Sequence, residues 1–71
     1  MKFSEAVKAM RKQLKITQNE LANMLHVTST TISRWESDKA NPNQLARTVL
    51  LDFCKTNKVD SSIVEDLKEK R

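Results

Sequence analysis

The stretch that decides the fold is TQNELANMLHVTSTTISRWE, residues 17–36. At its start, the Thr17 hydroxyl can accept a hydrogen bond from the amide of Glu20, and the Glu20 carboxylate can accept one from the amide of Thr17. This reciprocal pair is a capping box, which marks the N-terminus of a helix. The apolar spacing predicts a helix that begins at Thr17, ends near Leu25 and turns Leu21, Ala22 and Leu25 inward.

A second start signal follows at Thr28. Thr28 is a favourable N-cap, and Val27 and Ile32 can pack together as a hydrophobic staple. We expect a helix from Thr28 to about Ser37, joined to the preceding one by a turn around His26 and Val27. Because this turn is so short, the two helices should cross at a steep angle.

The N-terminal side of this stretch carries apolar residues at helical spacing. At positions i, i+4, i+7 and i+11 stand Phe3, Val7, Met10 and Leu14. On an α-helix they form one narrow stripe, which predicts a helix from about Phe3 to Lys15. The opposite side carries Lys8, Lys12 and Lys15, which we interpret as a solvated face in preference to a binding stripe.

A further helix is expected to begin at Asn41-Pro42. Asn41 is a suitable N-cap, Pro42 suits the first helical position, and Gln44 takes the third. We expect the core face of this helix to consist of Leu45, Ala46, Val49, Leu50 and Phe53. Leu51 and Cys54 then project elsewhere and leave apolar surface outside the core stripe.

The last helix is expected to run from Asp60 or Ser62 toward the C-terminus, with a frayed tail from Lys68 to Arg71. Its apolar residues are Ile63, Val64 and Leu67. The sequence shows neither strand-like alternation nor an internal repeat. We therefore expect an all-α fold, a compact bundle of about five short helices that forms a single domain over residues 1–71.

The composition favours a small binding domain in a reducing compartment. Thirteen Lys and Arg residues stand against nine Asp and Glu, so the formal net charge is +4, which favours a polyanionic partner without establishing one. Cys54 is the only cysteine, so no internal disulfide can form. We see no apolar run that could span a membrane and no secretory signal, and we expect a cytoplasmic protein without a membrane partner.

Nothing in the sequence indicates an enzyme. It shows no nucleophile–base pair, no glycine-rich loop and no metal-ligand spacing, so we expect no catalysis, no cofactor and no bound metal. His26 is interpreted as a turn residue in preference to a ligand or an acid–base group. Cys54 is interpreted as a buried small hydrophobe in preference to a reactive thiol.

The helix expected over residues 28–37 has two unlike faces. With Ser29 at zero, Ser33, Thr30 and Arg34 fall within about 140° on one side, while Thr31, Trp35 and Ile32 fall on the other. We assign Trp35 to the core in preference to stacking on a base. Short hydroxyl side chains permit close approach to base edges. Arg34 can contact guanine O6 and N7, bind a phosphate, or pair with Glu36 or Asp38.

Residues 17–36 resemble the helix-turn-helix of the Cro/CI-type (XRE-like) phage and bacterial repressors. The resemblance rests on the Gln that opens the first helix, the Leu-Ala pair one turn on, the apolar residue before the second helix, and the run Ile32-Ser33-Arg34-Trp35-Glu36. It extends over most of the chain. It implies a lambda-repressor-like fold whose second helix of the motif inserts in the major groove of an operator, in a bacterial cytoplasm.

The resemblance also implies roles for particular residues. Base-contacting positions of the family match Ser29, Thr30 and Arg34, with Ser33 beside them. Phosphate-contacting positions match Gln18, Thr28, Lys39 and Asn41, the first two at helix N-termini where exposed amides favour an anion. Arg11 and Glu36 match a partly buried ion pair that joins the first helix to the recognition helix.

The sequence departs from the family pattern at two turns. His26 stands where the family usually has the glycine of the turn, and Asp38 stands near the glycine that follows the recognition helix. Both positions commonly require a positive φ. His and Asp tolerate that conformation better than most residues, at some energetic cost.

Two functions remain open. The first is a sequence-specific transcriptional regulator of the repressor kind that binds double-stranded DNA. The alternative is an antitoxin that binds a toxin protein and also its own promoter. For the regulator we expect a homodimer, at least on DNA, because one recognition helix covers only a few base pairs. Its contact could be made by Leu51, Cys54, Ile63, Val64 and Leu67, unless the last helix simply packs back on the one before it.

Overall fold

The structure is a computed structural model that describes residues 1–68. These residues form five α-helices and no strand, namely α1 (Phe3–Leu14), α2 (Gln18–Leu25), α3 (Ser29–Glu36), α4 (Gln44–Thr56) and α5 (Ser61–Leu67). The expected all-α bundle is confirmed. The expected fraying of the tail lies, from residue 69 on, outside the described residues. No described helix combines the length and the apolar character that crossing a membrane requires.

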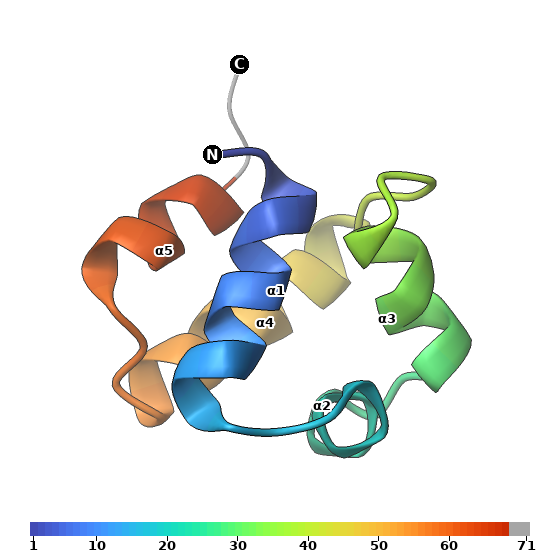
Figure 1. The fold of residues 1–71 in the computed structure, drawn as a ribbon, viewed down its shortest axis with the longest axis horizontal. Coiled ribbons are helices and arrows are strands. Elements are labelled where there is room, and N and C mark those ends of the chain that lie inside the picture. Colours follow the sequence, from blue (N-terminus) through green and yellow to red (C-terminus); the bar gives the residue numbers. More distant parts are fainter. Residues whose placement is uncertain (69–71) are drawn as a thin grey trace.

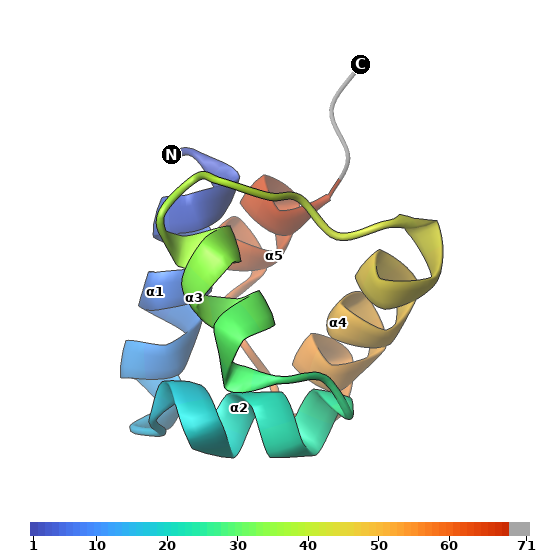
Figure 2. The same cartoon turned by 90° about the vertical axis from the view of Figure 1, so that its right-hand side faces the viewer.

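Helix α1 lies in the middle of the bundle, with α5 on one side and α3 on the other (Figure 1). Helix α4 lies behind α1 in this view and packs against α2 and α5. Helices α2 and α3 cross at a steep angle, as expected from the short turn between them (Figure 2). The side of α3 that faces away from α1 has no helix over it (Figure 2).

The core gathers the inward faces of all five helices. Its largest fully buried side chains are Met10, Leu21, Ile32, Leu50, Leu67, Val7 and Cys54. Trp35 is 3% exposed and meets the Phe3 ring edge to face, with centroids 6.0 Å apart and ring planes at 72°. The assignment of Trp35 to the core is therefore confirmed, and Trp35 and Ile32 fix the inner face of α3.

Side-chain caps begin α2 and α3 where the sequence predicts, and they begin α5 at Asp60, one of the two starts left open. The Thr17 hydroxyl accepts from the amide of Glu20 at 3.1 Å, and the Glu20 carboxylate accepts from the amide of Thr17 at 2.9 Å. The Thr28 hydroxyl accepts from the amide of Thr31 at 3.2 Å. Asp60 is the N-cap of α5. Each cap satisfies an amide that has no partner within the helix.

The predicted start of α4 is wrong by two residues. The N-cap is Asn43, whose side-chain oxygen accepts from the amide of Ala46 at 2.8 Å. Asn41 precedes a proline, which disfavours helical dihedrals there, and Pro42 is buried outside the helix. Two residues of the same capping type compete here, and Asn43 is the one that caps.

The predicted core face of α4 is also rotated. Of the predicted core residues, Leu50 is fully buried and Ala46 and Phe53 pack partly buried against the core, but Leu45 is 75% exposed and Val49 39% exposed. Cys54, which was expected to project elsewhere, is fully buried. Arg47 accounts for the rotation: its guanidinium lies 5.1 Å from the centre of the Phe3 ring and donates to the Leu67 carbonyl at 2.6 Å. The aliphatic part of an arginine can pack like a hydrophobe, and the apolar spacing alone does not show this.

Within residues 1–68, four residues other than glycine have a positive φ, namely Lys15, His26, Asp38 and Lys58. The expectation of a left-handed conformation at His26 and near Asp38 is confirmed, with φ of 59° and 62°. His26 ends α2 and makes the tight turn to α3. The left-handed conformation of each such residue lowers the stability of the fold by about 1 kcal/mol. Because the chain contains no glycine, it cannot avoid this cost at these helix ends.

Candidate nucleic-acid interface

The exposed side of α3 carries the four residues that the sequence assigns to base contact. Ser29, Thr30, Ser33 and Arg34 are all exposed, while Ile32 and Trp35 on the inner side are buried. Thr31 lies between the two faces, half-buried, with its hydroxyl 2.9 Å from that of Thr28. The structure thus brings the four residues together on one open face.

Arg34 is the only cation on this face of α3. Neither carboxylate that could have paired with it does so, because Glu36 binds Arg11 and Asp38 lies 3.8 Å from Lys2. Among residues 1–68, no ion pair or hydrogen bond holds the Arg34 guanidinium. Of the alternatives open from the sequence, the two pairings within the protein are not made among residues 1–68.

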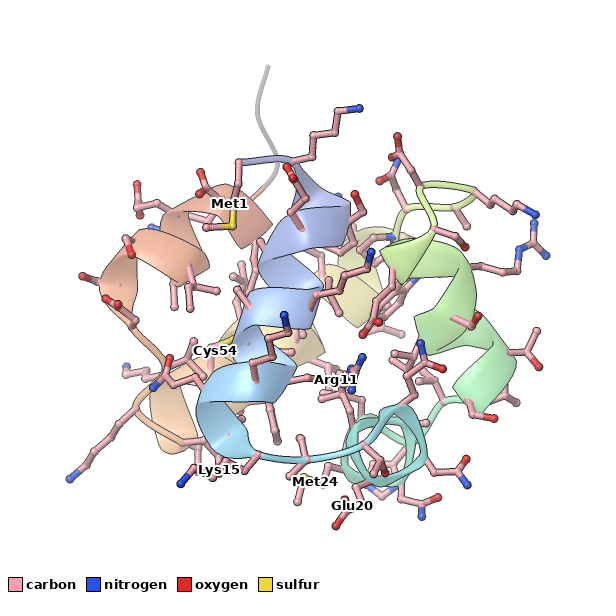
Figure 3. All side chains as sticks on the ribbon, viewed as in Figure 1. Met1, Arg11, Lys15, Glu20, Met24 and Cys54 are labelled. Atoms are coloured by element: carbon pink, nitrogen blue, oxygen red, sulfur yellow. The ribbon has the colours of Figure 1, made fainter. Side chains whose placement is uncertain are left out.

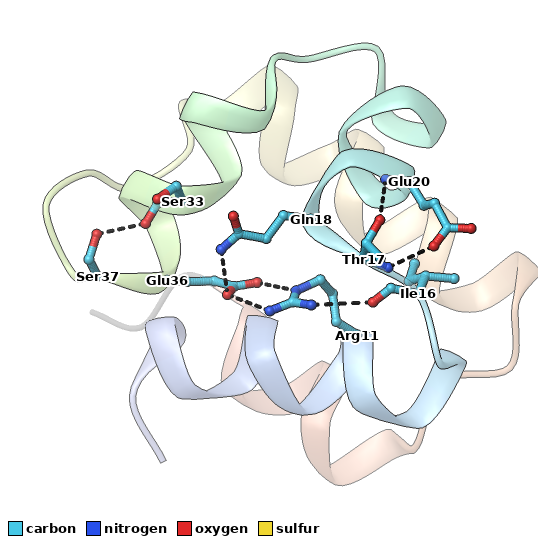
Figure 4. Close-up of polar contacts among 8 residues, drawn as sticks. All are labelled: Arg11, Ile16, Thr17, Gln18, Glu20, Ser33, Glu36 and Ser37. Atoms are coloured by element: carbon cyan, nitrogen blue, oxygen red, sulfur yellow. Dashed lines mark hydrogen bonds and ion pairs between the residues drawn. The ribbon is translucent and has the colours of Figure 1, made fainter.

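Arg11 and Glu36 form a bidentate ion pair between α1 and the last residue of α3 (Figure 4). Arg11 Nε donates to Glu36 Oε2 at 2.5 Å, and Arg11 Nη2 donates to Glu36 Oε1 at 2.8 Å. Arg11 Nη1 also donates to the Ile16 carbonyl at 3.2 Å. The two side chains are 23% and 4% exposed. The pair that the resemblance implied is therefore present, and it is largely buried.

The electrostatics of this pair follow from its geometry. Burial alone would raise the pKa of the Glu36 carboxyl, but hydrogen bonds from Arg11 and Gln18 outweigh it and hold that pKa below its ordinary value. The same contact raises the pKa of Arg11. Both groups therefore stay charged at neutral pH.

Gln18 opens α2 close to this pair (Figure 4). Its Nε2 donates to Glu36 Oε1 at 3.1 Å, so one of its N–H groups already has a partner inside the protein. The sequence did not reveal this bond, because residues 18 and 36 are far apart along the chain. Although it is bonded to Glu36, Gln18 is only half-buried, so part of its side chain stays accessible at the edge of the open face of α3.

The connection from α3 to α4 borders the other edge of that face. Lys39 and Asn41 are both exposed in it, as the expected phosphate contacts require. A groove of about 380 Å³ lies between this connection and α3, and its walls include Arg34, Asn41 and Asn43. Asn43 was not among the predicted site residues, because its part in the groove follows from the later start of α4.

Other reactive groups lie away from this surface. Cys54 lies on the side of α1 away from α3 (Figure 3). It is fully buried with its sulfur 3.3 Å from that of Met10, and burial raises the pKa of its thiol to about 11. Its interpretation as a buried hydrophobe is confirmed. Within residues 1–68, no group of three His, Cys, Asp or Glu residues could hold a metal ion.

Two short helices at a steep angle, the second anchored by its inner side and polar on its outer side, define a helix-turn-helix. A family model for the helix-turn-helix matches residues 7–46, more than half of the chain. The chain therefore belongs to the helix-turn-helix family of the Cro/CI type, as the resemblance implied. Its fold and its family are those of a DNA-binding helix-turn-helix domain.

Two known proteins are similar to this chain. The HTH-type transcriptional activator BcrR of Enterococcus faecalis is 44% identical over 43 residues, which are 61% of this chain. The chain spans only about a fifth of that relative, 21% of its length. The solution structure of the DNA-binding domain of the P22 C2 repressor matches all of this chain and 92% of that domain, with a TM-score of 0.73 and 29% identity.

Proposed function

We propose that this chain is a sequence-specific repressor that inserts α3 in the major groove of a DNA operator. The observation that carries the proposal is the exposed face of α3. There Arg34 stands beside short hydroxyl side chains and has no partner among residues 1–68. An α-helix with its side chains is about 10–12 Å across, which fits the major groove, about 12 Å wide. Ser29, Thr30 and Ser33 are short enough to let the helix approach the base edges.

Phosphate contacts on both sides of α3 would fix its position in the groove. On one side stand Gln18 and Thr28, the first residue of α2 and the N-cap of α3. Exposed amides at such helix starts favour an anion. On the other side stand Lys39 and Asn41 in the connection to α4. This arrangement supports a binding mode in which the duplex lies along α3 and its phosphates are bound on both sides of that helix.

Repression is proposed over activation because the similarity to the P22 C2 repressor domain covers the whole chain. The similarity to the activator BcrR covers 61% of it. We further propose that two copies bind one operator in a bacterial cytoplasm, since a single α3 covers few base pairs.

Binding-site selection from a library of random duplexes tests this function. We expect enrichment of one short motif that contains a guanine, with binding that weakens steeply as the salt concentration rises. A library that shows no enrichment, although the protein is folded, would contradict sequence-specific binding.

A further inference from the structure

Among the predicted phosphate ligands, Gln18 bonds through its side chain to a different helix, whereas the Thr28 hydroxyl bonds to Thr31 in the helix that it caps. Gln18 Nε2 donates to Glu36 Oε1, which is also the acceptor of Arg11 Nη2. We propose that Glu36 is a positioning residue for DNA binding, which holds the Gln18 amide so that its second N–H points to a DNA phosphate. This inference rests on the proposed function, and it assigns Glu36 a part in that function beyond stability.

The charge of Glu36 dictates the orientation of the Gln18 amide. A carboxylate accepts hydrogen bonds only, so the amide must turn its NH₂ group toward Glu36 and its oxygen away. An amide NH₂ has two hydrogens, and Gln18 Nε2 has no second partner among the described residues. One N–H is therefore fixed by Glu36, and the other is available to an acceptor outside the protein.

Arg11 makes this arrangement compatible with a nearby phosphate. A lone carboxylate 3.1 Å from the Gln18 amide would repel an incoming anion. The bidentate contact with Arg11 cancels the charge of Glu36 and also holds the carboxylate in place, because Arg11 is tied to the Ile16 carbonyl before α2. The ion pair thus connects α1, α2 and α3 at the point where Gln18 would meet the duplex (Figure 4).

Preorganisation of this kind lowers the entropy lost on binding. A free glutamine side chain must give up its rotamers when it binds phosphate, whereas Gln18 has given them up on folding. The contribution of Gln18 to DNA affinity should therefore depend on the presence of Glu36, although Glu36 itself contacts no DNA.

The test compares Gln18→Ala in two backgrounds, the wild type and an Arg11→Met, Glu36→Met variant. The double variant replaces the ion pair by apolar side chains of similar length, an exchange that proteins often tolerate. Affinity is measured on a mixed-sequence duplex of about 20 base pairs, two helical turns. We expect Gln18→Ala to weaken binding about fivefold in the wild type, the effect of one hydrogen bond. In the variant background the loss should be less than about twofold.

Lys39→Ala is the matched control, because Lys39 is a proposed phosphate contact whose side chain lies outside this network. It should weaken binding by the same factor in both backgrounds. An equal loss for Gln18→Ala in both backgrounds would overturn the inference while leaving DNA binding intact. Failure of the wild type to bind any duplex would instead contradict the proposed function.

Nuclear magnetic resonance of the wild type gives a second answer that does not depend on the folding of any variant. The two side-chain amide protons of Gln18 should have well-separated signals, one of them bonded to Glu36. On addition of the same duplex, we expect the bonded proton to keep its shift and the other proton to move. Loss of the bonded signal on DNA binding would show that Gln18 leaves Glu36, and would overturn the inference.

Discussion

At the scale of single residues, the ion pair of Arg11 and Glu36 is the electrostatic contact on which the stability of the fold depends most. A buried charge that loses its partner is left in a poorly solvated site, so one substitution costs more than the pair itself contributes. Glu36 is 4% exposed and accepts three hydrogen bonds. Its protonation in acid should have the same effect as its removal.

We therefore predict that Glu36→Gln destabilises the protein by about 3 kcal/mol at neutral pH. The folded pKa of Glu36 lies below its ordinary value, so its contribution is complete above that ordinary value and is lost as pH falls through the folded pKa. The gap in stability between wild type and variant should shrink in thermal melts from about pH 6 to about pH 2. Equal stability at neutral pH, or a gap that acid leaves unchanged, would contradict this account.

At the scale of helices, local hydrogen bonds determine where a helix begins, whereas tertiary contacts determine which of its faces is buried. Caps at Thr17 and Thr28 are local hydrogen bonds within a few residues, so the sequence predicts the starts of α2 and α3 correctly. For α5 the sequence left Asp60 and Ser62 open, and Asp60 is the cap. The face of α4 depends on Arg47 packing against Phe3 and bonding the Leu67 carbonyl, residues distant along the chain. No periodicity encodes such a contact. The predicted face was therefore right for Leu50 and in part for Ala46 and Phe53, but wrong for Leu45 and Val49.

The difference between local signals and contacts between distant residues also limits how much of the interface the sequence predicts. The outer residues of α3 follow from its helical phase, which Ile32 and Trp35 fix from within. The bond from Gln18 to Glu36 joins two helices, and it follows only from their crossing. The Arg34 guanidinium is likewise unpaired among the described residues because Glu36 binds Arg11 and Asp38 lies near Lys2. Both partners come from the distant helix α1 or the residue before it, so the sequence alone does not show this.

The corrected start of α4 gives a prediction at this scale. Asn43→Ala removes the cap on the amide of Ala46 and should destabilise the protein by about 1 kcal/mol. Asn41→Ala is the matched control, because Asn41 is exposed and lies outside the helix. It should leave the stability nearly unchanged in denaturant unfolding. The reverse order of the two losses would place the cap at Asn41.

At the scale of the whole molecule, the surface for a second copy must be smaller than the sequence suggests. Three of the expected contact residues, Cys54, Ile63 and Leu67, are buried in the core, so that assignment was wrong and α5 packs back on α4. Leu51 and Val64 remain half-exposed, and they line a groove of about 430 Å³ between α4 and α5. Lysines stand around it, which opposes strong self-association of the free protein.

We predict a monomer in free solution and two copies on a selected operator, as measured by sedimentation. Leu51→Lys should weaken binding of the second copy, because it adds a further positive charge to a groove already surrounded by lysines. Met24→Lys is the control, with the same change of charge at an exposed residue of α2. It should leave the stoichiometry unchanged. A single bound copy on every selected duplex would rule out the two-copy arrangement.

The central claim, that α3 reads bases through Arg34, is tested most directly by binding of Arg34→Ala to an operator series at several salt concentrations. We predict a loss of about 1–3 kcal/mol on the preferred operator, relaxed preference at one base pair, and an unchanged salt dependence. Lys39→Ala is the comparison for a phosphate contact, with a uniform loss and a salt slope lowered by about one unit. If Arg34→Ala shows the same uniform loss of affinity and the same lower salt slope as Lys39→Ala, Arg34 binds a phosphate, and the claim that it reads a base is contradicted.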